Sequence, residues 1–155
     1  MSEPTLHLRQ MSWRDLPGVL AIEHESFPAD AWSPAQFWSE LAGVDIDRRY
    51  VVLCDGEDVV GYAGVRLFAP EAEILTIAID PDYRGLGAGR RLVEHLEAEA
   101  TAAGCDQMHL EVAVGNESAH GMYAAVGYAD VGIRPNYYGI GRDATLMAKQ
   151  LQVIR

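Results

Sequence analysis

The part of this sequence best suited to chemistry is a glycine-rich loop between an apolar run and a long amphipathic segment. Ile74–Ile79 is predicted to be a strand, and Arg84-Gly-Leu-Gly-Ala-Gly89 leads into a predicted helix from Ala88 to Ala103. Glycines 85, 87 and 89 let the backbone approach a ligand closely, and the helix start adds unpaired N–H donors at the positive end of its dipole. Loops of this kind bind anions, most naturally phosphate. The sequence therefore predicts a site for a phosphorylated cofactor.

Two well-known phosphate-binding motifs do not fit these glycines. A nucleotide-hydrolase loop needs Lys-Ser or Lys-Thr after its last glycine, where this chain has Arg90-Arg91. A dinucleotide fingerprint needs G-x-G-x-x-G, and counting from Gly85 its last position is Arg90. The spacing Arg84-x-x-Gly87-x-Gly89 after an apolar strand instead resembles the acetyl-CoA pyrophosphate loop of the GCN5-related N-acetyltransferase superfamily. The alternative is a turn that only reverses the chain, but three alternating glycines weaken a helix start that holds no ligand.

A second set of reactive side chains follows the next predicted strand, Gln107–Val112. Glu111 lies in this otherwise apolar strand, Asn116 follows it, and Tyr123 lies in the predicted helix Ala119–Val126. A right-handed strand–helix–strand crossover predicts that this strand runs beside Ile74–Ile79, and open α/β sheets bind ligands at such strand ends. An Asn before a short helix that carries a Tyr resembles the second half of the same superfamily's site.

The resemblance narrows to the RimI-type ribosomal-protein-alanine N-acetyltransferases and covers nearly the whole chain, most closely from Glu73 to Met147. Pro135 stands where the family often has a second Arg, and Gly139 where it commonly has Pro. Both lie near the expected peptide-binding surface, so they bear on substrate preference and not on the reaction. The matching segments are Ile77-Ala-Ile79, Asp80-Pro-Asp-Tyr83, Leu110-Glu-Val112, Asn116 to Tyr123, Arg134-Pro-Asn-Tyr-Tyr138 and Gly141-Arg-Asp-Ala144.

The resemblance implies an enzyme that moves acetyl from acetyl-CoA to the N-terminal alanine of a small-subunit ribosomal protein. It implies Glu111 as the general base, acting through water, and Tyr123 as the acid that protonates the coenzyme thiol. An α-amino group has a pKa of about 7.7–8.0, against about 10.4 for a lysine side chain, so an N-terminal amine needs only mild help from a base.

The resemblance also assigns binding residues. Trp32, Tyr137 and Tyr138 are expected to bind the acceptor, since the two tyrosines lie in a Pro/Asn/Gly loop; Trp32 and Phe27 either line the acceptor groove or close the core. The expected coenzyme-binding residues are Ile77, Ala78, Ile79, Arg84, Gly85, Leu86, Gly87, Ala88, Gly89 and Asn116.

Simpler structural explanations exist for these residues. Glu111 is alternatively a solvated edge residue, Tyr123 a packing residue and Asn116 only a helix cap. His109 and Glu111 have the His-x-Glu spacing of zinc deaminases, but no Pro-Cys-x-x-Cys follows, so no metal site is expected. Acetylation of lysine side chains or small polyamines, and a non-catalytic acyl-CoA-binding module, are the alternative functions.

Composition restricts the class of protein. The 155 residues are 49% hydrophobic and 23% charged, as in one soluble globular domain, which we expect to span residues 1–155. No apolar run approaches the roughly 20 residues that span a bilayer, and no secretory signal is visible, so a cytoplasmic location is expected. Cys54 and Cys105 are expected to be buried free thiols.

The net charge of −11 is unevenly distributed along the chain. Residues 1–80 carry 14 acidic against 5 basic residues, a net of −9, whereas residues 81–155 carry 9 against 7, a net of −2. Such a surface repels nucleic acid and attracts a basic peptide or protein. Ordinary solubility explains the charge equally well. We expect a basic protein N-terminus as partner, with neither nucleic acid nor membrane.

These residues require a scaffold in which strands and helices alternate. The order is mixed α/β, and the resemblance implies a mostly antiparallel central sheet with a parallel pair at the acetyl-CoA site, flanked by about four helices. The predicted strands are Leu6–Gln10, Arg49–Cys54, Val59–Phe68, Glu73–Ile79, Gln107–Val112, Tyr128–Arg134 and Arg142–Leu151. The predicted helices are Leu16–Ser26, Pro34–Leu41, Ala88–Ala103 and Ala119–Val126.

Overall fold

A seven-stranded sheet organises the computed structural model, which describes residues 5–152. The strand order is β1-β2-β3-β4-β5-β7-β6, and β4 and β5 form the parallel pair among otherwise antiparallel neighbours. The mixed α/β fold with four flanking helices is therefore confirmed. The strands are β1 Leu6–Gln10, β2 Arg48–Asp55, β3 Asp58–Phe68, β4 Glu71–Ile79, β5 Gln107–Ala113, β6 Ala129–Arg134 and β7 Ala144–Gln150. The helices are α1 Leu16–Ser26, α2 Pro34–Leu41, α3 Ala88–Ala102 and α4 Glu117–Ala125, with short 3-10 turns at Trp13–Asp15 and Pro81–Tyr83.

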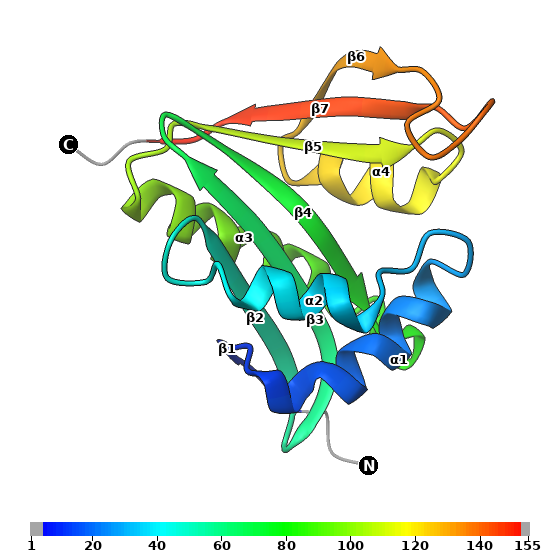
Figure 1. Ribbon diagram of the computed structural model, residues 1–155. Helices are drawn as coiled ribbons and strands as arrows, with labels where there is room; N and C mark the ends of the chain where they lie inside the picture. Colours follow the sequence, from blue (N-terminus) through cyan, green and yellow to red (C-terminus); the bar gives the residue numbers. More distant parts are fainter. Residues whose placement is uncertain (1–4, 153–155) are drawn as a thin grey trace.

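The helices cover the two faces of the sheet and create two apolar cores. α1 and α2 lie on one face of β2–β4, and α3 lies on the opposite face, with α4 beneath β5 and β7 (Figure 1). Leu92, Val93 and Leu96 form the buried stripe of α3, as their spacing predicts. Phe37 of α2 is fully buried in the other core. Both cysteines are buried and free, which confirms that prediction.

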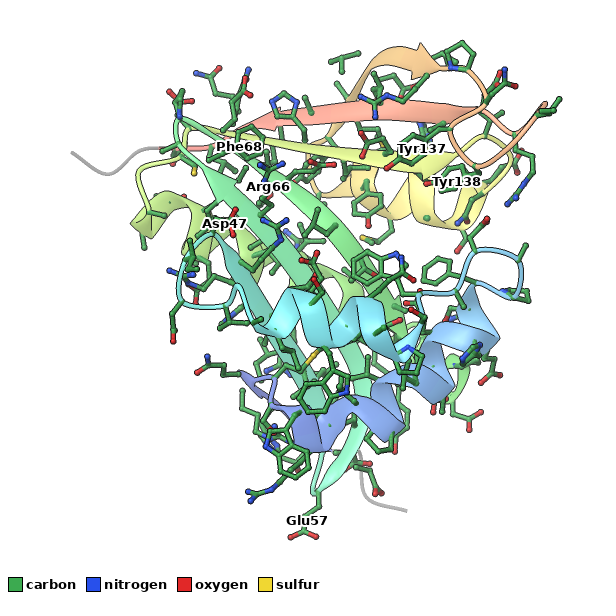
Figure 2. All side chains as sticks on the ribbon, viewed as in Figure 1. Asp47, Glu57, Arg66, Phe68, Tyr137 and Tyr138 are labelled. Atoms are coloured by element: carbon green, nitrogen blue, oxygen red, sulfur yellow. The ribbon has the colours of Figure 1, made fainter. Side chains whose placement is uncertain are left out.

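Several element boundaries differ from the sequence prediction because polar side chains set them. The Asn116 side chain accepts from Ala119 N at 3.2 Å, so α4 begins at Glu117 and not at Ala119. β7 begins at Ala144 and not at Arg142, since Asp143 accepts from the backbone N–H of Asn136 at 2.9 Å and belongs to the loop. β2–β3 is the predicted hairpin, with Glu57 at its tip (Figure 2).

The parallel pairing of β4 and β5 is much shorter than predicted. It joins Glu71–Glu73 to Gln107–His109 and includes none of Ile74–Ile79, so the expectation that the second strand runs beside that whole segment is wrong. The two strands start together and diverge toward their carboxyl ends, as Figure 1 shows. The sheet therefore opens at its centre, between β4 and β5.

A β-bulge in β4 sets the direction of the side chains that border this opening. Gly64 pairs with Thr76 and Val65 with Ile74, so Leu75 is the extra residue. Strict alternation would put Ile74 and Ile77 on opposite faces of the sheet. With the bulge, both pack against the core beneath α3.

Replacing Gly64 by Ala tests the packing of β3 against β2. An added Cβ would lie 2.1 Å from Cε1 of Tyr50, a buried residue directly opposite in the register. We expect Gly64→Ala to lower the free energy of unfolding by about 1–3 kcal/mol in chemical denaturation, because a packed ring must move. In the matched control Gly132→Ala, the added Cβ would lie 3.5 Å from Leu146 Cδ1, an ordinary van der Waals contact. We expect this variant to lower the free energy of unfolding by no more than about 0.5 kcal/mol. Equal losses in the two variants would contradict this packing argument.

Candidate functional site

A cleft of about 700 Å³ opens where β4 and β5 part. Its walls come from the carboxyl-terminal half of β4, the start of α3, the end of β5, and α4. A second set of lining residues comes from α1 and the loop after it, together with Tyr138 from the loop between β6 and β7. The predicted site residues in its lining are Trp32, Ile77, Ala78, Ile79, Arg84, Gly85, Gly87, Ala88, Gly89, Glu111, Asn116, Tyr123 and Tyr138.

The glycine loop presents backbone N–H groups at the start of α3. Gly85 and Gly87 have φ values of 79° and 76°, in the left-handed region that favours glycine. Gly87 is the N-cap of α3, and no side chain caps the helix. Arg91 N donates to Gly87 O at 3.1 Å, so the amides before Arg91 have no partner within the helix. This arrangement suits an anion, as the sequence predicts.

Close packing holds the loop against the sheet. The Tyr83 hydroxyl donates to Asp55 Oδ2 at 2.6 Å and ties the turn before the loop to the end of β2. A Cβ on Gly89 would lie 3.3 Å from Ile79 Cδ1 and 3.6 Å from Met122 Cε, so glycine allows α3 to approach both β4 and α4. The loop is therefore positioned by rigid elements on each side.

Glu111 lies on the face of β5 away from the α3 core, with 13% of its side chain exposed. Burial, and then the neighbouring Glu73 carboxyl group, raise the pKa of Glu111 to about 7, although Arg134 opposes the shift. Arg134 Nη1 lies 3.5 Å from Glu111 Oε1. A carboxyl group that titrates near neutral pH inside a cleft is suited to accept and release protons.

Tyr123 is buried at the α4 wall of the cleft. Burial, with a smaller contribution from Tyr138, raises the pKa of the Tyr123 phenol, which therefore keeps its proton at neutral pH. Its ring contacts Tyr128 edge to face, with the centroids 5.9 Å apart. Tyr128 in turn donates to Glu97 at 2.9 Å. The Tyr123 phenol is thus protonated and held in a packed position.

The opposite end of the cleft is built from the loop between α1 and α2. Glu23, 1% exposed, accepts from the backbone N–H of Trp32 at 2.9 Å and from the Tyr62 hydroxyl. The Trp32 ring packs on Phe37 at 5.1 Å between centroids, so Trp32 both lines the cleft and closes the core. Asp30 of this loop forms an ion pair with Arg142 of the β6–β7 loop.

Two of the predicted residues do not line the cleft. Leu86 is 51% exposed at the tip of the glycine loop. Tyr137 contacts its neighbour Tyr138 edge to face, with the centroids 4.9 Å apart, but lies outside the lining and contacts the Arg134 guanidinium at 5.2 Å. Figure 2 shows both tyrosines on the side of β5 and β7 that faces the α1–α2 loop. Asn116 both caps α4 and lines the cleft, so its two interpretations are compatible.

Sequence reasoning missed the acidic residues Glu23, Asp30 and Glu73. Glu23 is an acid on the side of α1 that carries the apolar residues Val19 and Ile22, which is a usable signal. The contacts of Asp30 and Glu73 depend on segments far away in the chain, so no local pattern reveals them. Among residues 5–152 no group of three or more His, Cys, Asp or Glu side chains is arranged to hold a metal ion. No helix in that range is long and apolar enough to cross a membrane.

Comparison with known proteins relates this chain to one family. The model described as the acetyltransferase (GNAT) family matches residues 8–128. The chain is 38% identical over 125 residues to the N-alpha-acetyltransferase RimI of Mycobacterium tuberculosis, covering 77% of this chain and 76% of that protein. It is 35% identical over 139 residues to the ribosomal protein bS18-alanine N-acetyltransferase of Escherichia coli, covering 86% and 90%.

The fold supports the same relationship. The crystal structure of the ribosomal-protein-S18-alanine N-acetyltransferase from Escherichia coli superposes with a TM-score of 0.83 at 29% identity, covering 97% of each chain. An uncharacterized protein of Mycobacterium leprae is 38% identical over 144 residues, and there the match spans 89% of this chain but only 39% of the relative.

The anion-binding role of the glycine loop is tested by Gly87→Ala. Alanine disfavours the positive φ of Gly87, so the backbone would change its conformation and the N–H groups that follow would point elsewhere. We therefore expect the affinity for coenzyme A, measured by calorimetry, to fall at least about tenfold, or about 1.4 kcal/mol. Gly56→Ala is the matched control, because Gly56 has φ 61° at the hairpin tip, outside the cleft, and its Cβ also meets open space. Each variant should lose about 1–2 kcal/mol of stability. Unchanged coenzyme affinity in Gly87→Ala would refute the role of the loop.

Proposed function

This chain belongs to the acetyltransferase (GNAT) family, and we propose that it acetylates the N-terminal alanine of a small-subunit ribosomal protein. As a member of that family it is an acetyl-CoA-dependent N-acetyltransferase. One observation supports this choice of acceptor. The chain is 35% identical to an enzyme named for the alanine of ribosomal protein bS18, and the match covers 90% of that enzyme. The acidic character of residues 1–80 suits such a basic partner.

The residues of the cleft fit acetyl-CoA. The uncapped amides at the start of α3 and the glycine loop would hold the pyrophosphate. β4 pairs with β5 only as far as Glu73, so the backbone edge of Ile77–Ile79 is available to the amide groups of the pantetheine arm, in the manner of an added strand. When bound, acetyl-CoA supplies the thioester that donates the acetyl group.

In the proposed mechanism Glu111 is the general base. The acceptor amine must lose a proton to attack a carbonyl carbon, and a base that titrates near 7 suits an α-amino group at neutral pH. The position of Glu111 in the opening between β4 and β5 supports this role, because the acceptor and the thioester must meet there. A single water molecule is sufficient to carry the proton between the two groups.

Tyr123 is the general acid in this mechanism. The leaving thiolate needs a proton, and a buried phenol that keeps its proton at neutral pH can donate one. Tyr123 lies on α4 and Glu111 on β5, so the donor and the acceptor of protons line different walls of one cleft. Proton transfer at each group contributes about 10²–10⁴-fold to the rate.

The acceptor class is decided by peptide acetylation. A library of peptides with a free N-terminal alanine followed by basic residues is incubated with the enzyme and acetyl-CoA, and the products are identified by mass spectrometry. Matched peptides with a blocked N-terminus and internal lysines form the control. We expect product only on free N-termini, with alanine preferred. Acetylation of the blocked peptides would refute the proposal and favour lysine side chains.

Glu111→Gln tests the base. We expect kcat with an N-terminal-alanine peptide to fall by about 10²–10⁴-fold, while coenzyme A affinity in calorimetry stays within about twofold. Glu117→Gln is the control: it changes another acid in the same region, on the first turn of α4, that does not line the cleft. A rate for Glu111→Gln equal to wild type would remove Glu111 from the mechanism.

A further inference from the structure

A second carboxyl group contacts Glu111 from the facing strand. Glu73 is the last residue of β4 paired with β5, opposite His109, and Glu111 is the next residue of β5 on the same face as His109. Glu73 and Glu111 are therefore neighbours on one face of adjacent strands, and, beyond the effect of burial, the Glu73 carboxyl group is close enough to raise the pKa of Glu111. An ionised carboxylate has no proton to donate, so a hydrogen bond between two carboxyl groups requires one of them to be protonated. Two carboxyl groups placed side by side in this way can therefore share a proton once Glu111 has accepted it.

We propose that Glu73 is a positioning residue for Glu111, and that the two side chains act as a one-proton carboxyl pair at the point where β4 and β5 separate. The inference rests on the function proposed above, in which Glu111 accepts the proton of the acceptor amine. Glu73 itself does not line the cleft, so it acts through Glu111 and not on the substrate.

The charges around Glu111 leave the pair with excess negative charge. Arg134 on β6 is the cation that faces Glu111, at 3.5 Å, and its side chain is 54% exposed. Tyr137 and Tyr138 face it from the β6–β7 loop, as neutral phenols whose pKa values are raised by burial. One half-exposed guanidinium cannot neutralise two carboxylates. The remaining negative charge is compensated when the pair binds a proton.

The arginine opposite Glu73 is engaged elsewhere. Arg66 is opposite Glu73 in the β3–β4 register, but its guanidinium lies over the Phe68 ring at 5.3 Å and 3.8 Å from Asp47. Figure 2 shows Arg66 between Asp47 and Phe68. His109, opposite Glu73 on β5, has its Nε2 3.7 Å from Glu71 Oε1, beyond hydrogen-bond distance.

The pair has a defined task in proton transfer. In the step proposed above, a proton leaves the amine nitrogen for a carboxylate oxygen of Glu111, while the nitrogen lone pair forms the bond to the acetyl carbon. The new O–H of Glu111 then donates to Glu73, which fixes its direction. By its negative charge Glu73 also raises the proton affinity of Glu111 toward the working pH, where a base is most effective.

The pH dependence of kcat/KM for one N-terminal-alanine peptide tests the pair. In the wild type we expect the acid limb of the profile near pH 7, set by Glu111. Glu73→Gln removes the like charge and adds an amide donor to Glu111, so the limb should move at least about one pH unit lower. Glu71→Gln changes an acid two residues away on the same strand, which contacts His109, and should leave the limb in place.

A second measurement needs no substrate. ¹³C NMR titration of glutamate carboxyl carbons in the resting protein should give Glu111 a transition near pH 7 in wild type and at least about one unit lower in Glu73→Gln, with Glu111→Gln used for assignment. An unmoved Glu111 transition, or a Glu73→Gln enzyme as slow as Glu111→Gln at every pH, overturns the proposal. Because the titration uses no acceptor, it reports on the pair even where the alanine acceptor has been refuted.

Discussion

β4 and β5 share three residue pairs, from Glu71 to Glu73, before they diverge, and the remainder of the site depends on this separation. Parallel strands that stayed paired would satisfy each other's backbone groups and leave no opening at the centre of the sheet. The divergence instead gives β4 a free edge and forms a cleft of about 700 Å³ between the two strands. Each residue to which a role in binding or catalysis is proposed lies on an element that borders this cleft, or on an element that contacts such a border element.

The two sides of the opening carry different chemistry. The side of α3 and α4 offers backbone N–H groups and the Tyr123 phenol, which suit a phosphorylated ligand and a leaving thiolate. The side of α1 and the β6–β7 loop carries carboxylates, among them Glu23 and Asp30, which suit a cationic amine. Glu111 lies between them on β5. In the proposed mechanism, this division separates the side of the cleft that holds the coenzyme from the side that holds the acceptor amine.

Local sequence patterns predicted most of the fold. Ser33 and Pro34 mark the start of α2 by their capping chemistry, the apolar stripe marks α3, and Asp55 to Asp58 marks the hairpin, because each signal lies within a few residues of its effect. The glycine loop and the resemblance likewise indicated the cleft residues Ile77–Ile79 and those between Arg84 and Gly89, with Leu86 as the exception. The length of the β4–β5 pairing was not predictable, because it depends on the bulge at Leu75 and on packing from both faces. The contact between Glu73 and Glu111 joins strands separated by a whole helix, and no local pattern contains it.

The start of α3 also connects ligand binding to folding. The helix begins without a capping side chain, although its buried face supplies Leu92, Val93 and Leu96 to the main core. An anion held there supplies the partner that a cap would otherwise provide, an interaction of about 0.5–2 kcal/mol. By linkage, a ligand at 100 times its dissociation constant adds about 2.7 kcal/mol to the stability of the native state. Depletion of the coenzyme therefore slows turnover and at the same time leaves the molecule more open to proteolysis.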